Sequence, residues 1–258
     1  MANDKRAAQM ANKNKPPRFI ERNNFYGFVL DDEQLLFVNS IWDKDKLVIM
    51  CNAAAGSGKT QLATGVANLL VQYGFFEKIV YIVSSYGENR QGYLPGSITE
   101  KSEVYFEPFY QALLNCDVNP NTAINTASMI NQKNGTAYIT CLTHTFLRGT
   151  NLDNAVVIID EAQNFTVPEL KKTLTRCSDN CKVICIGHDL QCDLPDHNKS
   201  GFVQYINHFN GDPRTAVCNL TKNYRGWISS HADSFGSDGI DMLHNIKDPA
   251  PCKISQWW

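Results

Sequence analysis

The stretch that decides the fold is Leu47-Val-Ile-Met-Cys-Asn-Ala-Ala-Ala-Gly-Ser-Gly-Lys-Thr60. It begins with an apolar run that suits a buried strand and continues as a loop of small residues ending in Gly-Lys-Thr. An amphipathic pattern over Gly58–Tyr73 predicts a helix directly after the loop. Gly56 and Gly58 let the backbone turn its N–H groups inward at the positive end of that helix. The stretch therefore predicts a phosphate-binding loop, or P-loop.

The residue types in this loop suit a bound nucleoside triphosphate. Lys59 is expected to reach the β- and γ-phosphates, and Thr60 to offer its hydroxyl to Mg²⁺. Ala53 departs from the strict G-x-x-x-x-G-K-[ST] pattern, which has glycine there. We expect this alanine to shift the start of the loop or to lower its affinity, because alanine has less backbone freedom. The predicted nucleotide-binding residues of the loop are Ala53, Ala54, Ala55, Gly56, Ser57, Gly58, Lys59, Thr60 and Gln61.

A second motif, Ala155-Val-Val-Ile-Ile-Asp-Glu-Ala-Gln-Asn164, places two carboxylates at the end of another apolar run. In open α/β sheets, ligands bind at the carboxyl ends of the strands. Asp160 is therefore predicted to hold Mg²⁺, and Glu161 to orient or deprotonate the water that attacks the γ-phosphate. The alternative is that both carboxylates only cap the helix expected from Val167, which leaves their pairing with the P-loop unexplained.

A third apolar run, Lys182–Gly187, leads into a polar segment that contains Gln191. The amide of a glutamine both donates and accepts hydrogen bonds. Gln191 is therefore predicted to contact the γ-phosphate and the attacking water. His188 and Asp189 stand beside it with no assigned role.

The rest of the chain continues the alternation of apolar runs and amphipathic stretches. Most of the apolar runs are continuous, as expected for strands buried on both faces. This succession predicts an α/β fold with a mostly parallel central sheet and crossover helices. The predicted strands are Lys46–Asn52, Lys78–Ser84, Ala137–Cys141, Ala155–Asp160, Lys182–Gly187 and Thr215–Thr221, and the predicted helices are Gly58–Tyr73, Glu103–Asn115, Val167–Cys177 and Gly201–Phe209.

Composition narrows the class of protein. The chain has 258 residues and a net charge of −2, which divides into +4 over residues 1–22 and −6 over the remainder. We expect residues 1–22 to form a flexible basic arm, which is either simply solvated or in contact with nucleic acid. No apolar run approaches the ~20 residues of a membrane span, and no secretory signal is evident, so we expect no membrane association. The nine cysteines are odd in number and suit a reducing cytoplasm.

Two residue clusters have a structural and a functional interpretation. Four aromatic residues at helical spacing favour a core face over a base-stacking platform: Tyr105, Phe106, Phe109 and Tyr110. Six cysteines and histidines within a short stretch suggest zinc, but their spacings differ from those of paired zinc knuckles, so core packing is favoured. They are Cys177, Cys181, Cys185, Cys192, His188 and His197.

Taken together, these motifs resemble the PhoH-like ATPases, relatives of the first motor domain of superfamily 1 helicases. The resemblance covers about residues 30–235 and includes Gly92-Tyr-Leu-Pro-Gly96, Asp160-Glu-Ala-Gln-Asn164 and Leu174-Thr-Arg176. It implies a three-layer RecA-like P-loop NTPase domain, ATP and Mg²⁺ as cofactors, ring-like homo-oligomers, and action on RNA or single-stranded nucleic acid. The expected organisation is an arm over residues 1–22, the ATPase domain over residues 23–236 and a C-terminal tail over residues 237–258.

The resemblance adds two site residues and one departure. Gln34 lies where related helicases use a glutamine to contact adenine, and a surface glutamine is the alternative. Leu220-Thr-Lys-Asn-Tyr-Arg225 resembles the helicase arginine motif, in which Arg225 would neutralise γ-phosphate charge; the alternative is a surface ion pair. His188 stands where the family has aspartate, which puts turnover in doubt more than nucleotide binding.

The function expected from the sequence is therefore a P-loop ATPase. Its main alternative is a nucleotide-gated binding protein with little turnover, which Ala53 and His188 favour. A small-molecule kinase fits less well, because the Asp-Glu-Ala-Gln motif and Gln191 suit water activation. A GTPase fits least, because no Asn-Lys-x-Asp guanine motif follows the acidic strand.

Overall fold

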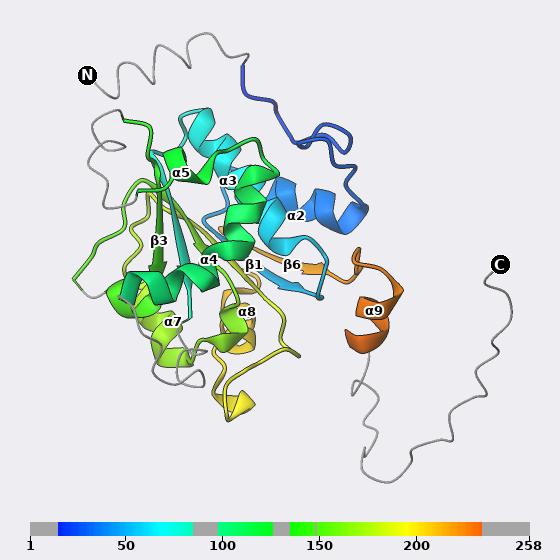
Figure 1. The fold of residues 1–258 in the computed structure, drawn as a ribbon, viewed down its shortest axis with the longest axis vertical. Coiled ribbons are helices and arrows are strands. Elements are labelled where there is room, and N and C mark those ends of the chain that lie inside the picture. The colour runs from blue at the N-terminus through cyan, green and yellow to red at the C-terminus, as the bar shows by residue number, and fades with distance from the viewer. Residues whose placement is uncertain (1–14, 85–97, 126–134, 148, 234–258) are drawn as a thin grey trace, which may run out of the picture.

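A single parallel sheet forms the centre of the molecule. The computed structural model describes residues 15–84, 98–125, 135–147 and 149–233 (Figure 1). Within these residues, six strands lie in the order β3-β2-β4-β5-β1-β6, and every neighbouring pair is parallel. The strands agree with the predicted ones to within two residues at each end. They are β1 (Val48–Ala53), β2 (Lys78–Val83), β3 (Ile139–Thr143), β4 (Ala155–Ile159), β5 (Lys182–Gly187) and β6 (Thr215–Leu220).

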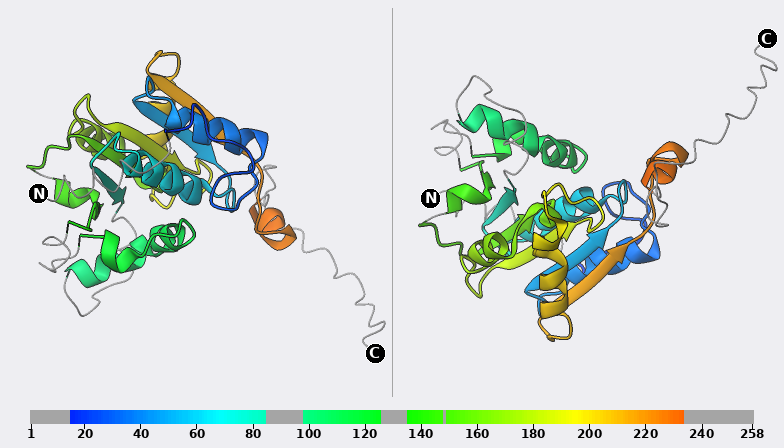
Figure 2. Two further views of the ribbon diagram at one scale, coloured as in Figure 1. Left: turned by 90° about the horizontal axis from the view of Figure 1, so that it is seen from above. Right: turned by 90° about the horizontal axis from the view of Figure 1, so that it is seen from below.

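Helices cover both faces of the sheet and complete three layers (Figure 2). One apolar core joins α2, α3 and α4 to one face, and a second core joins α7 and α8 to the other. The predicted α/β, three-layer architecture is therefore confirmed. The helices are α2 (Asp32–Trp42), α3 (Lys59–Gln72), α4 (Ile98–Leu114), α5 (Pro120–Ala123), α7 (Val167–Leu174), α8 (Phe202–Phe209) and α9 (Trp227–Asp233). Short 3₁₀ helices are η2 (His144–Leu147), η3 (Ala162–Asn164) and η4 (His197–Lys199).

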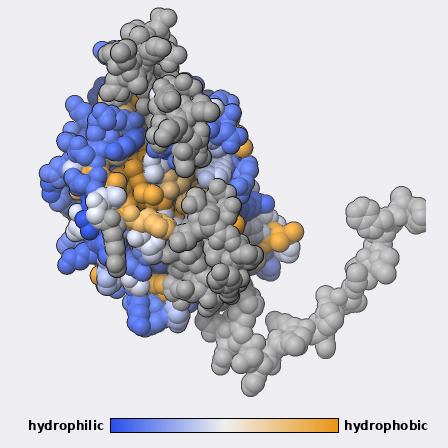
Figure 3. All heavy atoms as spheres, turned by 60° about the vertical axis from the view of Figure 1, so that its left-hand side comes forward, coloured by the Kyte–Doolittle hydropathy of each residue, from blue (hydrophilic) through white to orange (hydrophobic). Residues whose placement is uncertain are grey.

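The sequence explains why the central strands are so deeply placed. Every residue of β4 and β5 is buried, and both strands are rich in valine and isoleucine, which suit a sheet covered on both sides. The aromatic cluster predicted to be a core face also lies in the core, where the Phe109 ring stacks on Tyr81 with 4.1 Å between centroids. The edge strand β3 is less deeply buried. Figure 3 shows apolar side chains gathered near the middle of the face that comes forward from the left of Figure 1.

The strand order brings three sequence motifs to one edge of the sheet. β5 lies between β1 and β4, so its last residue, Gly187, stands between the loop after β1 and the acidic residues after β4. All three strands are parallel, so their carboxyl ends share this edge. The topology therefore gathers the predicted site, although its parts are far apart in the sequence.

The N-terminal segment differs in part from the predicted flexible arm over residues 1–22. Ile20 is buried and exchanges two backbone hydrogen bonds with the side chain of Asn39 on α2. The carbonyl of Pro17 accepts a hydrogen bond from the Trp42 indole. The last residues of the expected arm are thus packed on α2, because an apolar side chain and backbone groups find partners there. Residues 1–14, the motif at residues 92–96 and the expected tail at residues 237–258 lie outside the described residues.

Candidate functional site

The loop after β1 has the geometry of a phosphate cradle. β1 ends at Ala53, and the loop then turns through Gly56 and Gly58, whose φ angles are +68° and +85°. Positive φ angles of this kind are easy for glycine and costly for other residues. α3 begins directly afterwards at Lys59, so its free N–H groups point back toward the loop. The hydroxyl of Ser57, although buried, has no hydrogen-bond partner among the described residues.

The start of the loop has alanine, Ala53, where the P-loop pattern has glycine. Ala53 is a strand residue that pairs with Leu220 of β6, and the next N–H, that of Ala54, donates to the Leu220 carbonyl at 2.8 Å. The backbone at Ala53 needs no positive φ, so alanine serves there as well as glycine would. The strand pairing at Ala53 is regular, and the expected effect of alanine on the loop or on its affinity stays a prediction.

The first turn of α3 meets the end of β4. The Thr60 hydroxyl donates to Asp160 Oδ2 at 2.8 Å, although the two residues are 100 positions apart. The hydroxyl of Tyr81, from β2, donates to the same oxygen at 2.8 Å, and the N–H of Glu161 donates to Asp160 Oδ1 at 2.8 Å. Three donors thus fix the orientation of one buried carboxyl group.

Burial sets the electrostatics around Asp160. Burial raises the pKa of the Asp160 carboxyl, and the neighbouring charge of Glu161 raises it further. Lys59 and the hydroxyls of Thr60 and Tyr81 oppose this by favouring the charged form. Burial also raises the pKa of the Tyr81 hydroxyl, so that group remains a hydrogen-bond donor. The site is therefore a place where a cation would relieve the cost of a buried carboxylate.

Glu161 stands beside the P-loop in a strained backbone conformation. Its φ and ψ angles of 50° and 44° lie in the left-handed region, which is rare for a residue with a side chain. The turn places Glu161 Oε1 3.3 Å from the Lys59 ammonium, and the other oxygen accepts from Gln163 Nε2 at 2.6 Å. The lysine that the sequence assigns to phosphate is thus paired with the predicted catalytic carboxylate.

Gln163 links the acidic motif to the segment after β5. Its amide nitrogen also donates to the Gln191 carbonyl at 3.2 Å, and its amide oxygen accepts from the His188 N–H at 3.0 Å. A Cβ added at Gly187 would stand 2.6 Å from Gln163 Oε1, so glycine is required for this close approach. Gln191 itself is exposed on the loop. Its predicted contact with phosphate stays a prediction.

The segment after β6 closes against the P-loop from the other side. The Tyr224 N–H donates to the Gly56 carbonyl at 2.9 Å. A Cβ added at Gly56 would lie 2.5 Å from Asn223 Oδ1 and 2.8 Å from Arg225 Cγ. The structure therefore places Arg225 beside the loop of its own chain.

Two predicted residues are engaged elsewhere. Gln34 donates to the Ser57 carbonyl at 3.0 Å and accepts from the Asp31 N–H, so its amide supports the P-loop and caps α2. The Gln61 side chain points to the turn that follows α4, where it donates to Cys116 Sγ and accepts from Asn115. Only the backbone of Gln61, in the first turn of α3, belongs to the loop region. Its predicted place among the nucleotide-binding residues stays a prediction.

A groove of about 460 Å³ opens beside the P-loop. It runs along the carboxyl ends of β1, β5 and β6 and is open to solvent on one side. The residues that line it are Asn52, Ala53, Ala54, His188, Asp189, Leu190, Asn219, Leu220, Thr221, Asn223 and Ser230.

Sequence reasoning missed two members of the site. Gln163 stands inside the quoted acidic motif, so its position was a signal, but a pattern does not show that its amide spans β4 and β5. Tyr81 gives no signal, because it lies within a continuous apolar run on a different strand. Among the described residues, no group of three or more His, Cys, Asp or Glu side chains is placed to hold a metal ion. No described helix is long and apolar enough to cross a membrane.

The chain matches one protein family in sequence and is similar to solved structures only distantly. The family described as PhoH-like protein matches residues 29–225. Protein PhoH of Escherichia coli (strain K12) is 32% identical over 193 residues, which are 74% of this chain and 52% of that protein. A PhoH-like protein of Bacillus subtilis (strain 168) is 38% identical over 152 residues, which are 57% of this chain and 44% of that protein. The chain thus spans about half the length of these relatives.

Among solved structures, the UvsW helicase from bacteriophage T4 aligns with a TM-score of 0.47 and 11% identity, covering 85% of this chain and 67% of that one.

Proposed function

The chain belongs to the PhoH-like protein family, as its motifs predict, and on this premise we propose that it is a Mg²⁺-dependent ATPase. In this proposal it hydrolyses ATP to ADP and phosphate within its P-loop core. One observation carries the proposal: Lys59, Thr60, Asp160 and Glu161 meet at one edge of the sheet. Two of them follow β1 and two follow β4, so the two pairs are distant in the sequence and come together only through the order of the strands.

The P-loop is suited to bind the phosphates. Its turned backbone and the start of α3 offer N–H groups, and Lys59 adds a positive charge that reaches the same space. The unpartnered hydroxyl of Ser57 supports this assignment, because a buried donor without a partner costs free energy until a ligand satisfies it. Gln34 is assigned to support of the loop rather than to adenine recognition, since its amide is already committed.

Mg²⁺ fits the oxygen groups beside the loop. Thr60 and Asp160 supply a hydroxyl and a carboxylate, the hard oxygen ligands that this ion prefers. When bound, the ion would neutralise charge on the phosphates. Tyr81 keeps the carboxylate oriented toward Thr60, so the two ligands remain on one side of the loop.

Glu161 is the proposed base for the attacking water. Its ion pair with Lys59 holds it at the site before nucleotide binds, and the pair must part when Lys59 turns to the phosphates. Gln163 would then keep the freed carboxylate in place through its 2.6 Å hydrogen bond. Gln191 and Arg225 are proposed to contact the γ-phosphate from the loop after β5 and the segment after β6.

A nucleotide switch with little turnover is the second candidate. His188 favours it, because its imidazole stands where the family has a carboxylate and its backbone is held by Gln163. The strand pairing of Ala53 with Leu220 accommodates alanine, so the support of Ala53 for the switch rests on the lower affinity expected from the sequence. The two candidates share one binding site and differ only in whether bound ATP is hydrolysed.

The wider role is proposed on family resemblance. We assign RNA or single-stranded nucleic acid as the polymer partner, a homo-oligomeric ring as the assembly and the cytoplasm as the location. The net charge of +4 over residues 1–22 supports contact with a phosphate polymer.

Phosphate release from ATP with Mg²⁺, with and without single-stranded RNA, tests the function. The wild type should hydrolyse ATP, RNA should raise the rate, and Lys59→Ala and Glu161→Gln should each lower it by about 100-fold or more. The matched controls are Lys46→Ala and Glu107→Gln. Each removes a charge of the same sign as its counterpart, Lys59 or Glu161, from a residue away from the site, and should leave the rate unchanged. Tight ATP binding without hydrolysis by the wild type would reject the ATPase and leave the switch.

A further inference from the structure

A cavity of about 590 Å³ lies at the amino ends of the strands, at the edge of the sheet opposite the P-loop. It is lined by the C-terminal ends of α2 and α3, by the first residue of β5 and by the N-terminal segment over residues 16–19. Small-molecule sites in proteins have volumes of about 300–1,000 Å³, so the cavity is large enough for a ligand. The proposed ATPase uses no residue that lines it.

The walls of the cavity are largely aromatic. Trp42 of α2 stands edge-on to Tyr73 and to Phe75, with 5.7 Å between ring centroids in both pairs. Its indole N–H donates to the Pro17 carbonyl at 3.0 Å, which fixes the N-terminal segment as one wall. Phe19 and Phe75 also line the cavity, and they are 57% and 49% exposed. Aromatic surface that borders a hollow and is open to solvent suits a planar, apolar ligand group.

One charged side chain is buried in this apolar wall. Lys182, the first residue of β5, lines the cavity and is only 2% exposed. Its ammonium donates to the Asp43 carbonyl at 2.6 Å and to the Lys46 carbonyl. Within the described part of the chain, no carboxylate forms an ion pair with it. An ammonium has three N–H donors, so the two neutral carbonyls leave one donor for a ligand and the positive charge without a counter-ion. An anion in the cavity would relieve the cost of this buried charge.

The other charges around the cavity also favour an anion. Arg18 and Lys44 line it, against the single carboxylate of Asp43. That carboxylate is engaged in its own turn, where Oδ1 accepts from the Asp45 N–H at 3.0 Å. Burial lowers the pKa of the Lys182 ammonium to about 8, while the charges of Asp43 and Asp45 oppose the shift. The ammonium is therefore charged at neutral pH, in surroundings that disfavour the charge.

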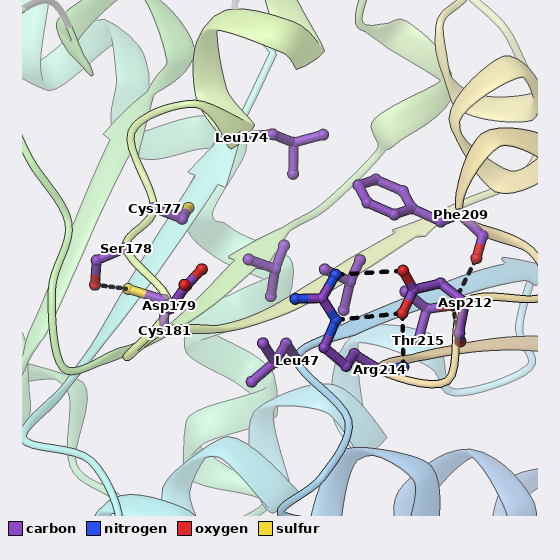
Figure 4. A pocket seen from close by; sticks show the side chains of 12 residues that line it. Leu47, Leu174, Cys177, Ser178, Asp179, Cys181, Phe209, Asp212, Arg214 and Thr215 are labelled. Atoms are coloured by element: carbon purple, nitrogen blue, oxygen red, sulfur yellow. Dashed lines mark hydrogen bonds and ion pairs between the residues drawn. The ribbon is translucent and has the colours of Figure 1, made fainter.

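A smaller groove on the other face of the sheet lacks this feature. It encloses about 200 Å³ beside α7 and α8, and Figure 4 shows its lining. Its cation, Arg214, is paired with Asp212, with 3.4 Å between Nη2 and Oδ2, and is exposed. An anion would have to displace that carboxylate, so Arg214 serves as the comparison for Lys182.

We propose that the cavity between Trp42 and Lys182 binds a small aromatic carboxylate. The ring of the ligand lies against Trp42 and Phe75, which are held edge-on to each other before it binds. The carboxylate accepts the third N–H of Lys182 in a charge-assisted hydrogen bond, a stronger kind than one between neutral groups. Arg18 and Lys44 add attraction from the same lining.

Titration calorimetry with two probes of one shape tests the charge requirement. The full chain is titrated with 2-naphthoate, which carries a carboxylate, and with 2-naphthylmethanol, which is neutral. The wild type should bind 2-naphthoate about tenfold or more tightly than 2-naphthylmethanol. Equal affinities, or no binding of 2-naphthoate, would overturn the proposal. Neither probe needs ATP hydrolysis, so this result is independent of the proposed ATPase.

Four variants locate the site. Lys182→Met keeps an unbranched side chain and should lower the affinity for 2-naphthoate to that for 2-naphthylmethanol. Phe75→Ala, at an exposed wall position, should weaken the binding of both probes and decides the case even if Lys182→Met does not fold. The controls Arg214→Met and Lys59→Ala remove a cation from the smaller groove and from the P-loop, and both should bind 2-naphthoate as the wild type does. The proposal fails if Lys182→Met keeps the preference for 2-naphthoate, if Phe75→Ala changes neither affinity, or if either control loses the binding.

Discussion

The Tyr81→Phe substitution probes how the buried carboxylate of the site is held. Phenylalanine keeps the ring that stacks on Phe109 and removes only the hydroxyl that donates to Asp160 Oδ2 at 2.8 Å. A hydrogen bond to a charged group contributes about 1.5–3 kcal/mol, whereas one between neutral groups contributes about 0.5–1.5 kcal/mol. We therefore expect the free energy of unfolding without nucleotide to fall by about 1.5–3 kcal/mol. Tyr138→Phe is the matched control, because its hydroxyl donates to the neutral amide of Asn68 at 2.7 Å.

The pH dependence gives this prediction a second, independent readout. The lost donor stabilises only the charged form of Asp160, so the variant raises the pKa of that carboxyl further above its already raised value. The stability difference from the wild type is then full at pH values where Asp160 is charged in both folded proteins, and it shrinks as pH falls through the folded-state pKa. Urea unfolding at several pH values measures it. The reasoning is refuted if Tyr81→Phe costs no more than Tyr138→Phe, or if its cost does not change with pH.

Three further substitutions test other parts of the account. Gln163→Leu leaves the His188 N–H without its acceptor, so it should lower the free energy of unfolding by about 1–3 kcal/mol. It should also reduce the ATPase kcat more than it changes KM. The control is Gln111→Leu, at an exposed residue of α4, and equal effects from this substitution would contradict the prediction. Gly56→Ala adds a Cβ at a positive φ, in close contact with Asn223 and Arg225, and should weaken ATP binding measured by titration. Gly27→Ala is the control: its φ is +79° and no atom lies within 4 Å of the added Cβ, so it should lower stability without changing ATP binding. Burial lowers the pKa of Lys182 from 10.5 to about 8, so the unfolded chain binds more protons between these pH values. The wild type should therefore gain stability over Lys182→Met as pH rises from 8 to 10.5, by about 3 kcal/mol at most, and urea unfolding that shows no relative gain would reject the shift.

The sheet was largely predictable because its strands carry an unusually clear signal. Runs such as Ala155–Ile159 are continuous and β-branched, and they stand between amphipathic helices, so both class and boundaries followed. The helix α2 is not among the predicted helices. Its start is marked by the capping box of Asp31 and Gln34, a role that neither sequence interpretation of Gln34, as an adenine contact or as a surface residue, includes.

The site was predictable where a motif fixes a role and unpredictable where a side chain crosses the fold. Lys59, Thr60, Asp160 and Glu161 follow from spacing, because the loop and the carboxylates each end a strand. The ion pair of Lys59 with Glu161 depends on a left-handed turn, which a pattern of residues does not reveal. The position of the Gln61 side chain was unpredictable for a related reason: its place in the sequence puts it next to the motif, while helix geometry turns its side chain toward the end of α4.

The central claim is that the P-loop and Asp160 form one site for ATP with Mg²⁺. The most direct test is equilibrium binding of an ATP analogue with a β–γ imido bridge, with Mg²⁺ or with a chelator, to the wild type and to Asp160→Asn. We predict that Mg²⁺ tightens binding to the wild type by about tenfold or more and that Asp160→Asn loses this gain while still binding the analogue. Wild-type binding that ignores Mg²⁺, or an equal Mg²⁺ effect in both proteins, would contradict the account.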